Sequence, residues 1–133
     1  MLAGEGLDRA QRIRQRPEFE RAYETGSKLR SKLLTIFLVP NDRQHPRLGV
    51  AASRKVGKAV QRNRAKRIAR EIFRRHKVAD AVDIVIVPRR ELLDAPFVRV
   101  EADYLAALRR LAAQPPAAGP RRGADGPRPD SVL

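Results

Sequence analysis

RLGVAASRKVGKAVQRNRAKRIAREIFRRHKVADAVDIVIVP, residues 47–88, places two apolar stretches on either side of a long basic one. Residues 47–53 and 82–88 favour strands, and the second is a continuous apolar run that ends in a proline, as is typical of a buried strand. Gly57 interrupts the chain before the basic stretch, where the spacing of apolar residues predicts a helix over 60–76. We therefore expect a strand–helix–strand crossover, which for parallel strands is right-handed by general rule.

The predicted basic helix has two chemically different faces. At about 100° per residue, one arc holds the apolar side chains of Ala65, Ile68, Ala69, Ile72 and Phe73. The opposite arc holds Arg62, Asn63, Lys66, Arg67, Arg70 and Arg74. We expect the first arc to pack on a core and the second to face solvent or a partner.

A short helix is predicted before this segment. Residues 16–26, RPEFERAYETG, begin with Pro17 at a favoured first-turn position and stop at Gly26. Phe19 and Tyr23 are four residues apart, so they lie on one face of this helix.

The remaining segments complete an α+β fold. Residues 31–42 are β-branched and aliphatic, and we expect them to pair with 47–53 as an antiparallel hairpin around a loop at 41–46. Residues 98–113 show apolar side chains at helical spacing and predict a closing helix that packs on the sheet. The expected architecture is a two-layer sandwich with a small mixed sheet, in the order α-β-β-α-β-α.

The ends of the chain differ from its middle. Residues 1–8 are expected to be a flexible N-terminus, and 9–113 a single domain. Residues 114–133 are rich in proline and glycine with almost nothing to bury, so we expect this tail to be disordered.

The charge of the chain predicts a polyanionic partner. Its 133 residues include 29 Lys and Arg against 15 Asp and Glu, a net charge of +14. Residues 54–77 alone hold eleven Lys or Arg and one acid, Glu71. Nucleic acid, an anionic membrane and an acidic protein all fit this balance. A solvated helix face is the plainer explanation, although such faces usually mix charges of both signs.

The composition argues against several kinds of chemistry. There is no Cys and there are only two His, so we expect no metal site built by the protein. No nucleophile motif, carboxylate pair or phosphate loop is present, and we expect no catalytic side chain. The chain shows no signal peptide and no apolar run long enough to span a bilayer, so we expect a soluble cytoplasmic protein.

Asn63 and three aromatic residues add chemistry that charge alone does not supply. An amide can donate and accept hydrogen bonds, so Asn63 is able to orient a phosphate or contact a base edge, although a helix-capping role is the alternative. Phe19, Tyr23 and Phe37 are candidates for a surface on which unpaired bases stack. The alternative for these three rings is the hydrophobic core.

The segment SRKVGKAVQRNRAKRIAREIFR resembles the R-N-R motif of the bacterial ribonuclease P protein subunit. That motif is a basic pair, a short glycine loop and then R-N-R-x-K-R-x-x-R. The matching residues are Arg54, Lys55, Gly57, Arg62, Asn63, Arg64, Lys66, Arg67 and Arg70. The resemblance runs from about residue 7 to 112 and includes QRIRQRPEFERAYETG, RLGVAASRK and VDIVIVPRR.

The resemblance implies a protein cofactor of a catalytic RNA. In such a complex the RNA, with RNA-bound Mg²⁺, hydrolyses the 5′ leader from precursor tRNA, which makes this chain a subunit of a ribonucleoprotein endoribonuclease. The residues implied in binding the RNA subunit are Lys55, Lys58, Arg62, Asn63, Arg64, Lys66, Arg67 and Arg70. Those implied in a cleft for the single-stranded leader are Phe19, Tyr23, Phe37 and Arg54.

The same resemblance implies a left-handed strand–helix–strand crossover, against the general rule.

The resemblance also implies the binding partners of the chain, which would be ribonuclease P RNA and precursor tRNA, with no membrane. We expect a monomeric protein in a 1:1 complex with the RNA. Tyr23 stands where the family more often has Phe, so its hydroxyl needs water or a polar partner.

Three other interpretations remain open at this point. A general RNA-binding or ribosome-associated protein explains the charge but gives no reason for the aromatic positions. A protein-only nuclease needs a carboxylate cluster that the sequence lacks. A protein of the membrane surface needs large exposed aromatic residues on the basic helix, whose apolar arc is better used as core.

Overall fold

The computed structural model describes residues 9–78 and 80–113, and the expectations for 1–8 and 114–133 lie outside these residues. The helices and strands follow the predicted order, with one strand and two short 3-10 helices added. They are η1 (Arg9–Gln11), α1 (Arg16–Thr25), β1 (Ser27–Arg30), β2 (Leu34–Pro40), β3 (Arg47–Val50), α2 (Ala59–Arg75), β4 (Val82–Pro88), η2 (Arg90–Asp94) and α3 (Phe97–Ala113).

The four strands form one mixed sheet in the order β1-β2-β4-β3. β4 pairs with β2 in the antiparallel sense and with β3 in the parallel sense. The expected hairpin between β2 and β3 is therefore wrong, because β4 lies between them. The hairpin that does form joins β1 to β2, and the sequence interpretation did not include β1.

The predicted crossover is present as β3, α2 and β4, with its two strands parallel. The left-handed sense implied by the resemblance stays a prediction. α2 spans Ala59–Arg75, one residue earlier at each end than predicted.

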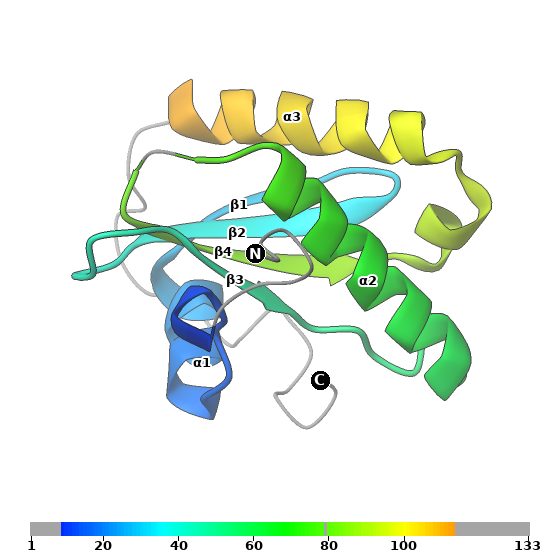
Figure 1. The fold of residues 1–133 in the computed structure, drawn as a ribbon, viewed down its shortest axis with the longest axis horizontal. Coiled ribbons are helices and arrows are strands. Elements are labelled where there is room, and N and C mark those ends of the chain that lie inside the picture. The colour runs from blue at the N-terminus through cyan, green and yellow to red at the C-terminus, as the bar shows by residue number, and fades with distance from the viewer. Residues whose placement is uncertain (1–8, 79, 114–133) are drawn as a thin grey trace, which may run out of the picture.

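The sheet has helices on both faces. α2 and α3 pack on one face, where Ile36, Ile84 and Ile86 meet the apolar side of α2. α1 packs on the other face, as Figure 1 shows, with Phe19 against Phe37 and Val85 in a second buried cluster. The structure thus has the expected sandwich of sheet and helices, to which α1 adds a partial third layer.

Tyr104 of α3 lies at the centre of the larger core without a polar partner. Its side chain is fully buried, and its hydroxyl makes no hydrogen bond within the described residues. Burial raises the pKa of this hydroxyl, because the phenolate would be desolvated. The hydroxyl therefore costs free energy that the aromatic ring does not.

We expect Tyr104→Phe to leave the free energy of unfolding unchanged or to raise it by up to about 1 kcal/mol. The substitution keeps the ring and removes only the unpaired oxygen. Urea unfolding, followed by circular dichroism, measures the change in unfolding free energy. With the denaturant slope m unchanged, this free energy follows from the shift in the urea midpoint. A loss of more than about 1 kcal/mol would show that the hydroxyl has a partner in solution.

Candidate nucleic-acid interface

The loop before α2 and the first turn of the helix place the basic motif at one end of the sheet. Gly57 has a φ of 148°, a conformation that side-chain-bearing residues rarely adopt. The backbone N–H of Lys58 then donates to Oε1 of Gln61 at 2.7 Å and closes the first turn. Arg62 supports the same loop, since its guanidinium donates to the carbonyl of Gly57 at 3.1 Å.

Asn63 has no part in this capping. It lies beyond the first turn, its side chain is exposed, and no hydrogen bond engages its amide within the described residues. The capping alternative for Asn63 is therefore wrong, because Gln61 fills that role. Its amide is available to a partner.

The outer surface of α2 is basic and free of acids over most of its length. Residues 59–70 include no Asp or Glu, and Arg64 and Arg67 are exposed. Glu71, the one acid of the helix, is bound near the C-terminal end by Arg74 at 2.5 Å and Arg75 at 2.7 Å. These two arginines lower the pKa of Glu71 through their hydrogen bonds. The acid thus offsets part of the positive charge at the end of the helix and none in the R-N-R region.

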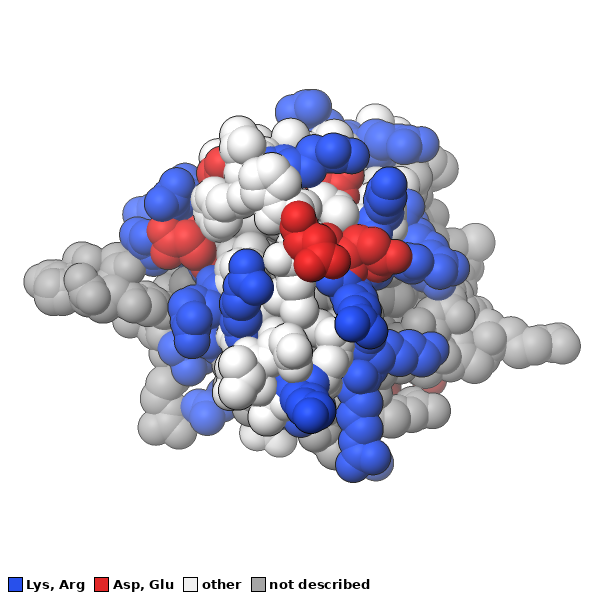
Figure 2. Space-filling view, turned by 90° about the vertical axis from the view of Figure 1, so that its right-hand side faces the viewer, with Lys and Arg blue, Asp and Glu red and all other residues white. Residues whose placement is uncertain are grey.

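The loop before α2 extends this surface. Arg54, Lys55 and Lys58 are all exposed. Figure 2 looks onto the side of the molecule where α2 begins and shows Lys and Arg over the whole of this face, while the acidic groups in view gather in its upper half. We call Lys55, Lys58 and the R-N-R residues through Arg70 the α2 basic surface, which Arg54 adjoins in the same loop.

Lys66 departs from the sequence expectation. The helical wheel put it on the charged arc, yet its side chain is only 5% exposed. Burial is the main cause that lowers its pKa, and the neighbouring charges of Arg62 and Arg70 lower it further. The pKa of Arg70 is lowered in the same way, by burial first and then by Arg12 and Arg67.

The three candidate aromatic residues come together, but not as an accessible platform. Phe19, Tyr23 and Phe37 are each 0% exposed. The ring centroids of Phe19 and Tyr23 lie 6.4 Å apart and those of Tyr23 and Phe37 lie 5.0 Å apart. The expectation of rings open to bases is therefore wrong for the folded chain as described, where they form the core between α1 and the sheet.

Gly49 of β3 explains how closely α1 approaches the sheet. A Cβ atom at this position would lie 2.9 Å from two carbons of the Phe19 ring. Only glycine therefore lets the ring rest directly on the strand backbone. The sequence pattern gave no sign of this contact.

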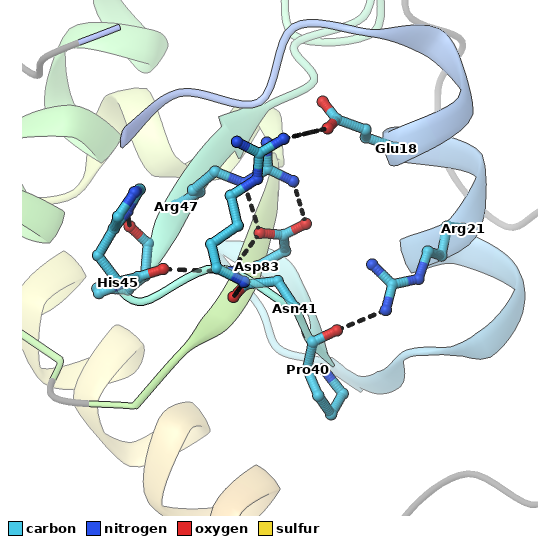
Figure 3. A network of polar contacts seen from close by, with 9 residues as sticks. Glu18, Arg21, Pro40, Asn41, His45, Arg47 and Asp83 are labelled. Atoms are coloured by element: carbon cyan, nitrogen blue, oxygen red, sulfur yellow. Dashed lines mark hydrogen bonds and ion pairs between the residues drawn. The ribbon is translucent and has the colours of Figure 1, made fainter. Parts of the chain in front are cut away.

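A buried ion-pair network binds the first turn of α1. Arg47 of β3 donates to both carboxylate oxygens of Asp83, at 2.9 and 2.7 Å, and to Glu18 of α1 at 2.9 Å (Figure 3). Asn41 adds a hydrogen bond to Asp83 at 2.8 Å. The hydrogen bond to Asp83 is the main cause that raises the pKa of Arg47, which stays charged. This network ties α1, β3 and β4 together.

Two further features bear on the site. No three His, Cys, Asp or Glu side chains gather as metal ligands in residues 9–78 and 80–113. Among the helices of this same part of the chain, none is both long and apolar enough to cross a membrane.

Comparisons with known proteins agree with this geometry. The family model named Ribonuclease P matches residues 7–112. The ribonuclease P protein component of Desulfovibrio desulfuricans is 42% identical over 112 residues, covering 80% of this chain and 86% of the relative.

Solved structures give the same result. The ribonuclease P protein from Thermotoga maritima superimposes with a TM-score of 0.68 and 35% identity, over 74% of this chain and 96% of that one. A mutant Staphylococcus aureus ribonuclease P protein, described as defective in mRNA degradation, gives a TM-score of 0.70 and 31% identity, over 76% of this chain and 87% of that one. The α+β fold, the basic motif and these relatives lead to one conclusion: the chain belongs to the ribonuclease P protein family.

Proposed function

We propose that this chain is the protein cofactor of a ribonuclease P ribonucleoprotein. It binds the catalytic RNA and the single-stranded 5′ leader of precursor tRNA and promotes removal of the leader. The RNA carries out the hydrolysis with RNA-bound Mg²⁺, and no protein side chain takes part in the chemistry. The observation that carries this proposal is the acid-free basic surface on α2 in a member of this family.

The RNA subunit contacts the α2 basic surface. The residues we assign to this contact are Lys55, Lys58, Arg62, Asn63, Arg64, Lys66, Arg67 and Arg70. Neutralising several phosphates at once releases counterions, so binding weakens steeply as salt rises. Asn63 adds the hydrogen-bonding capacity that cations lack.

Leader binding uses the side of the molecule where α1 meets the sheet, with Phe19, Tyr23, Phe37 and Arg54 as its residues. Arg54 is exposed and able to hold a leader phosphate directly. The three rings are buried, so bases stack on them only if the groups that cover them move. Phe19→Ala does not test this role cleanly, because removing a buried Phe costs about 3–5 kcal/mol of stability.

We expect Arg54→Gln to weaken binding of leader-bearing precursor tRNA by about tenfold and to leave binding of mature tRNA unchanged. The exposed side chain can change without disturbing the core. The measurement compares both ligands on the protein assembled with ribonuclease P RNA. Arg99→Gln, the same change at an exposed position on α3, is the control. Equal losses for precursor and mature tRNA would count against leader recognition and favour a general RNA-binding protein.

A cytoplasmic location and a monomeric protein in a 1:1 complex with the RNA belong to the same proposal. Mass measurement of the assembled particle tests the stoichiometry, and two protein copies per RNA would revise it.

A further inference from the structure

Three cations from two distant segments lie on the α2 side of the sheet. Arg12 precedes α1, while Lys66 and Arg70 lie on α2. We call these three residues the Arg12 cluster. Lys66 and Arg70 lie four residues apart on α2, so their side chains are neighbours on one side of the helix. Burial is the main cause that lowers the pKa of both groups. The charges of Arg62 and Arg70 add to this effect at Lys66, and that of Arg12 adds to it at Arg70.

The backbone explains why Arg12 points to this side. Arg12 forms a parallel bridge with Leu48 on the outer edge of β3, and the N–H of Ile13 donates to the carbonyl of Leu48 at 2.9 Å. Side chains alternate along an extended segment. Ile13 is buried in the cluster beneath α1, and Leu48 belongs to the core beneath α2. Arg12 therefore shares the face of Leu48 and lies beside α2.

Among residues 9–78 and 80–113, the cluster has no acidic partner. No ion pair or hydrogen bond to an acid engages Arg12, Lys66 or Arg70 within the described residues. Lys66 is 5% exposed, and the Nε atom of Arg12 is buried with no hydrogen-bond partner. Like charges that are partly desolvated and unpaired destabilise a folded chain, so an anion that joins them recovers that free energy.

The donors also restrict the ligand. Lysine and arginine side chains donate hydrogen bonds and accept none. A group with only acceptor oxygens and a negative charge satisfies them, and a phosphodiester is such a group. A base edge can offer acceptors, as guanine does with O6 and N7, but it carries no negative charge and so leaves the charge of the cluster uncompensated.

We propose that the Arg12 cluster is a recessed site for one backbone phosphate of the partner RNA, separate from the exposed contacts of Arg64 and Arg67. That the ligand belongs to RNA rests on the function proposed above; that the site takes a phosphate rests on the cluster alone. Arg12 lies outside the R-N-R motif, so the site extends the interface to the N-terminal segment.

The first test uses inorganic phosphate and thermal unfolding of the full chain, with ionic strength held constant by sodium chloride. At about ten times its dissociation constant, phosphate is expected to raise the Tm of the wild type by roughly 5–10 °C. Lys66→Met and Arg12→Gln are expected to lose at least half of that rise. The matched controls Lys77→Met and Arg14→Gln make the same substitutions at exposed positions and are expected to keep the full rise in Tm. Equal rises in all five proteins would overturn the proposal.

The second test measures binding to ribonuclease P RNA. Arg12→Gln is expected to bind about tenfold more weakly than Arg14→Gln, which lies two residues away in the same segment. If the two variants bind the RNA equally well, the cluster does not hold an RNA phosphate. If the wild type does not bind this RNA at all, the proposed function fails, and the phosphate test still decides whether the cluster is an anion site.

Discussion

A variant with both Arg64→Gln and Arg67→Gln is expected to bind ribonuclease P RNA about 100-fold more weakly than the wild type. Both side chains are exposed, and neither is paired with an acid in the described part of the chain. A charge-assisted hydrogen bond contributes about 1.5 kcal/mol or more, roughly tenfold in affinity for each residue. A filter-binding or fluorescence titration at several salt concentrations measures the loss of affinity. The slope of log K against log salt concentration should become shallower by about 1.5–2.

The matched control changes the same net charge elsewhere. Arg109→Gln with Arg110→Gln alters two exposed arginines near the end of α3, away from the start of α2. This double variant is expected to bind within about threefold of the wild type, because distant exposed charges are screened by salt. If the two double variants lose affinity equally, then net charge alone drives binding and the α2 basic surface is not the interface.

Asp83→Ala is expected to lower the free energy of unfolding by about 3–5 kcal/mol. Asp83 is 1% exposed and accepts hydrogen bonds from Arg47 and Asn41. Without it, Glu18 is the one ionic partner that the described residues leave to the buried guanidinium of Arg47. Urea unfolding of the isolated chain measures the change. Such a loss would also loosen α1, which the network ties to the sheet.

A second variant separates the unpaired charge from the lost volume. Arg47→Met combined with Asp83→Leu removes both charges, and replacing a buried ion pair by apolar side chains of similar size is often neutral or stabilising. This variant is expected to recover most of the loss. Glu91→Gln, which removes an exposed carboxylate, is expected to change stability little. A loss below about 1 kcal/mol for Asp83→Ala would mean that the pair is largely solvated.

Local pattern was enough to predict the helices and most strands, but not which strands pair. Apolar periodicity placed α2 within one residue of its observed ends. The six-residue loop between β2 and β3 is compatible with a hairpin, yet both strands pair with β4. The continuous apolar run of β4 does carry a signal, since a strand buried on both faces belongs in the middle of a sheet. Applied to 82–88, that rule would have excluded the hairpin.

The site was predictable only where side chains point away from the rest of the chain. Arg64 and Arg67 are exposed, as the helical wheel indicates. The wheel gives the direction of Lys66 but not the depth to which neighbouring segments cover it. Arg12 reaches α2 through a bridge to β3, which is a tertiary contact with no mark in the sequence. The burial of Phe19 likewise depends on Gly49 in a distant strand.

The most direct measurement is cleavage of a 5′-extended precursor tRNA at low millimolar Mg²⁺, with the protein alone, with a bacterial ribonuclease P RNA alone, and with both together. We expect efficient cleavage at the mature 5′ end only when both are present, because the protein supplies binding and the RNA supplies the chemistry. Cleavage by the protein alone would reveal a catalytic site in this chain, and an RNA whose activity the protein does not stimulate would contradict the cofactor role.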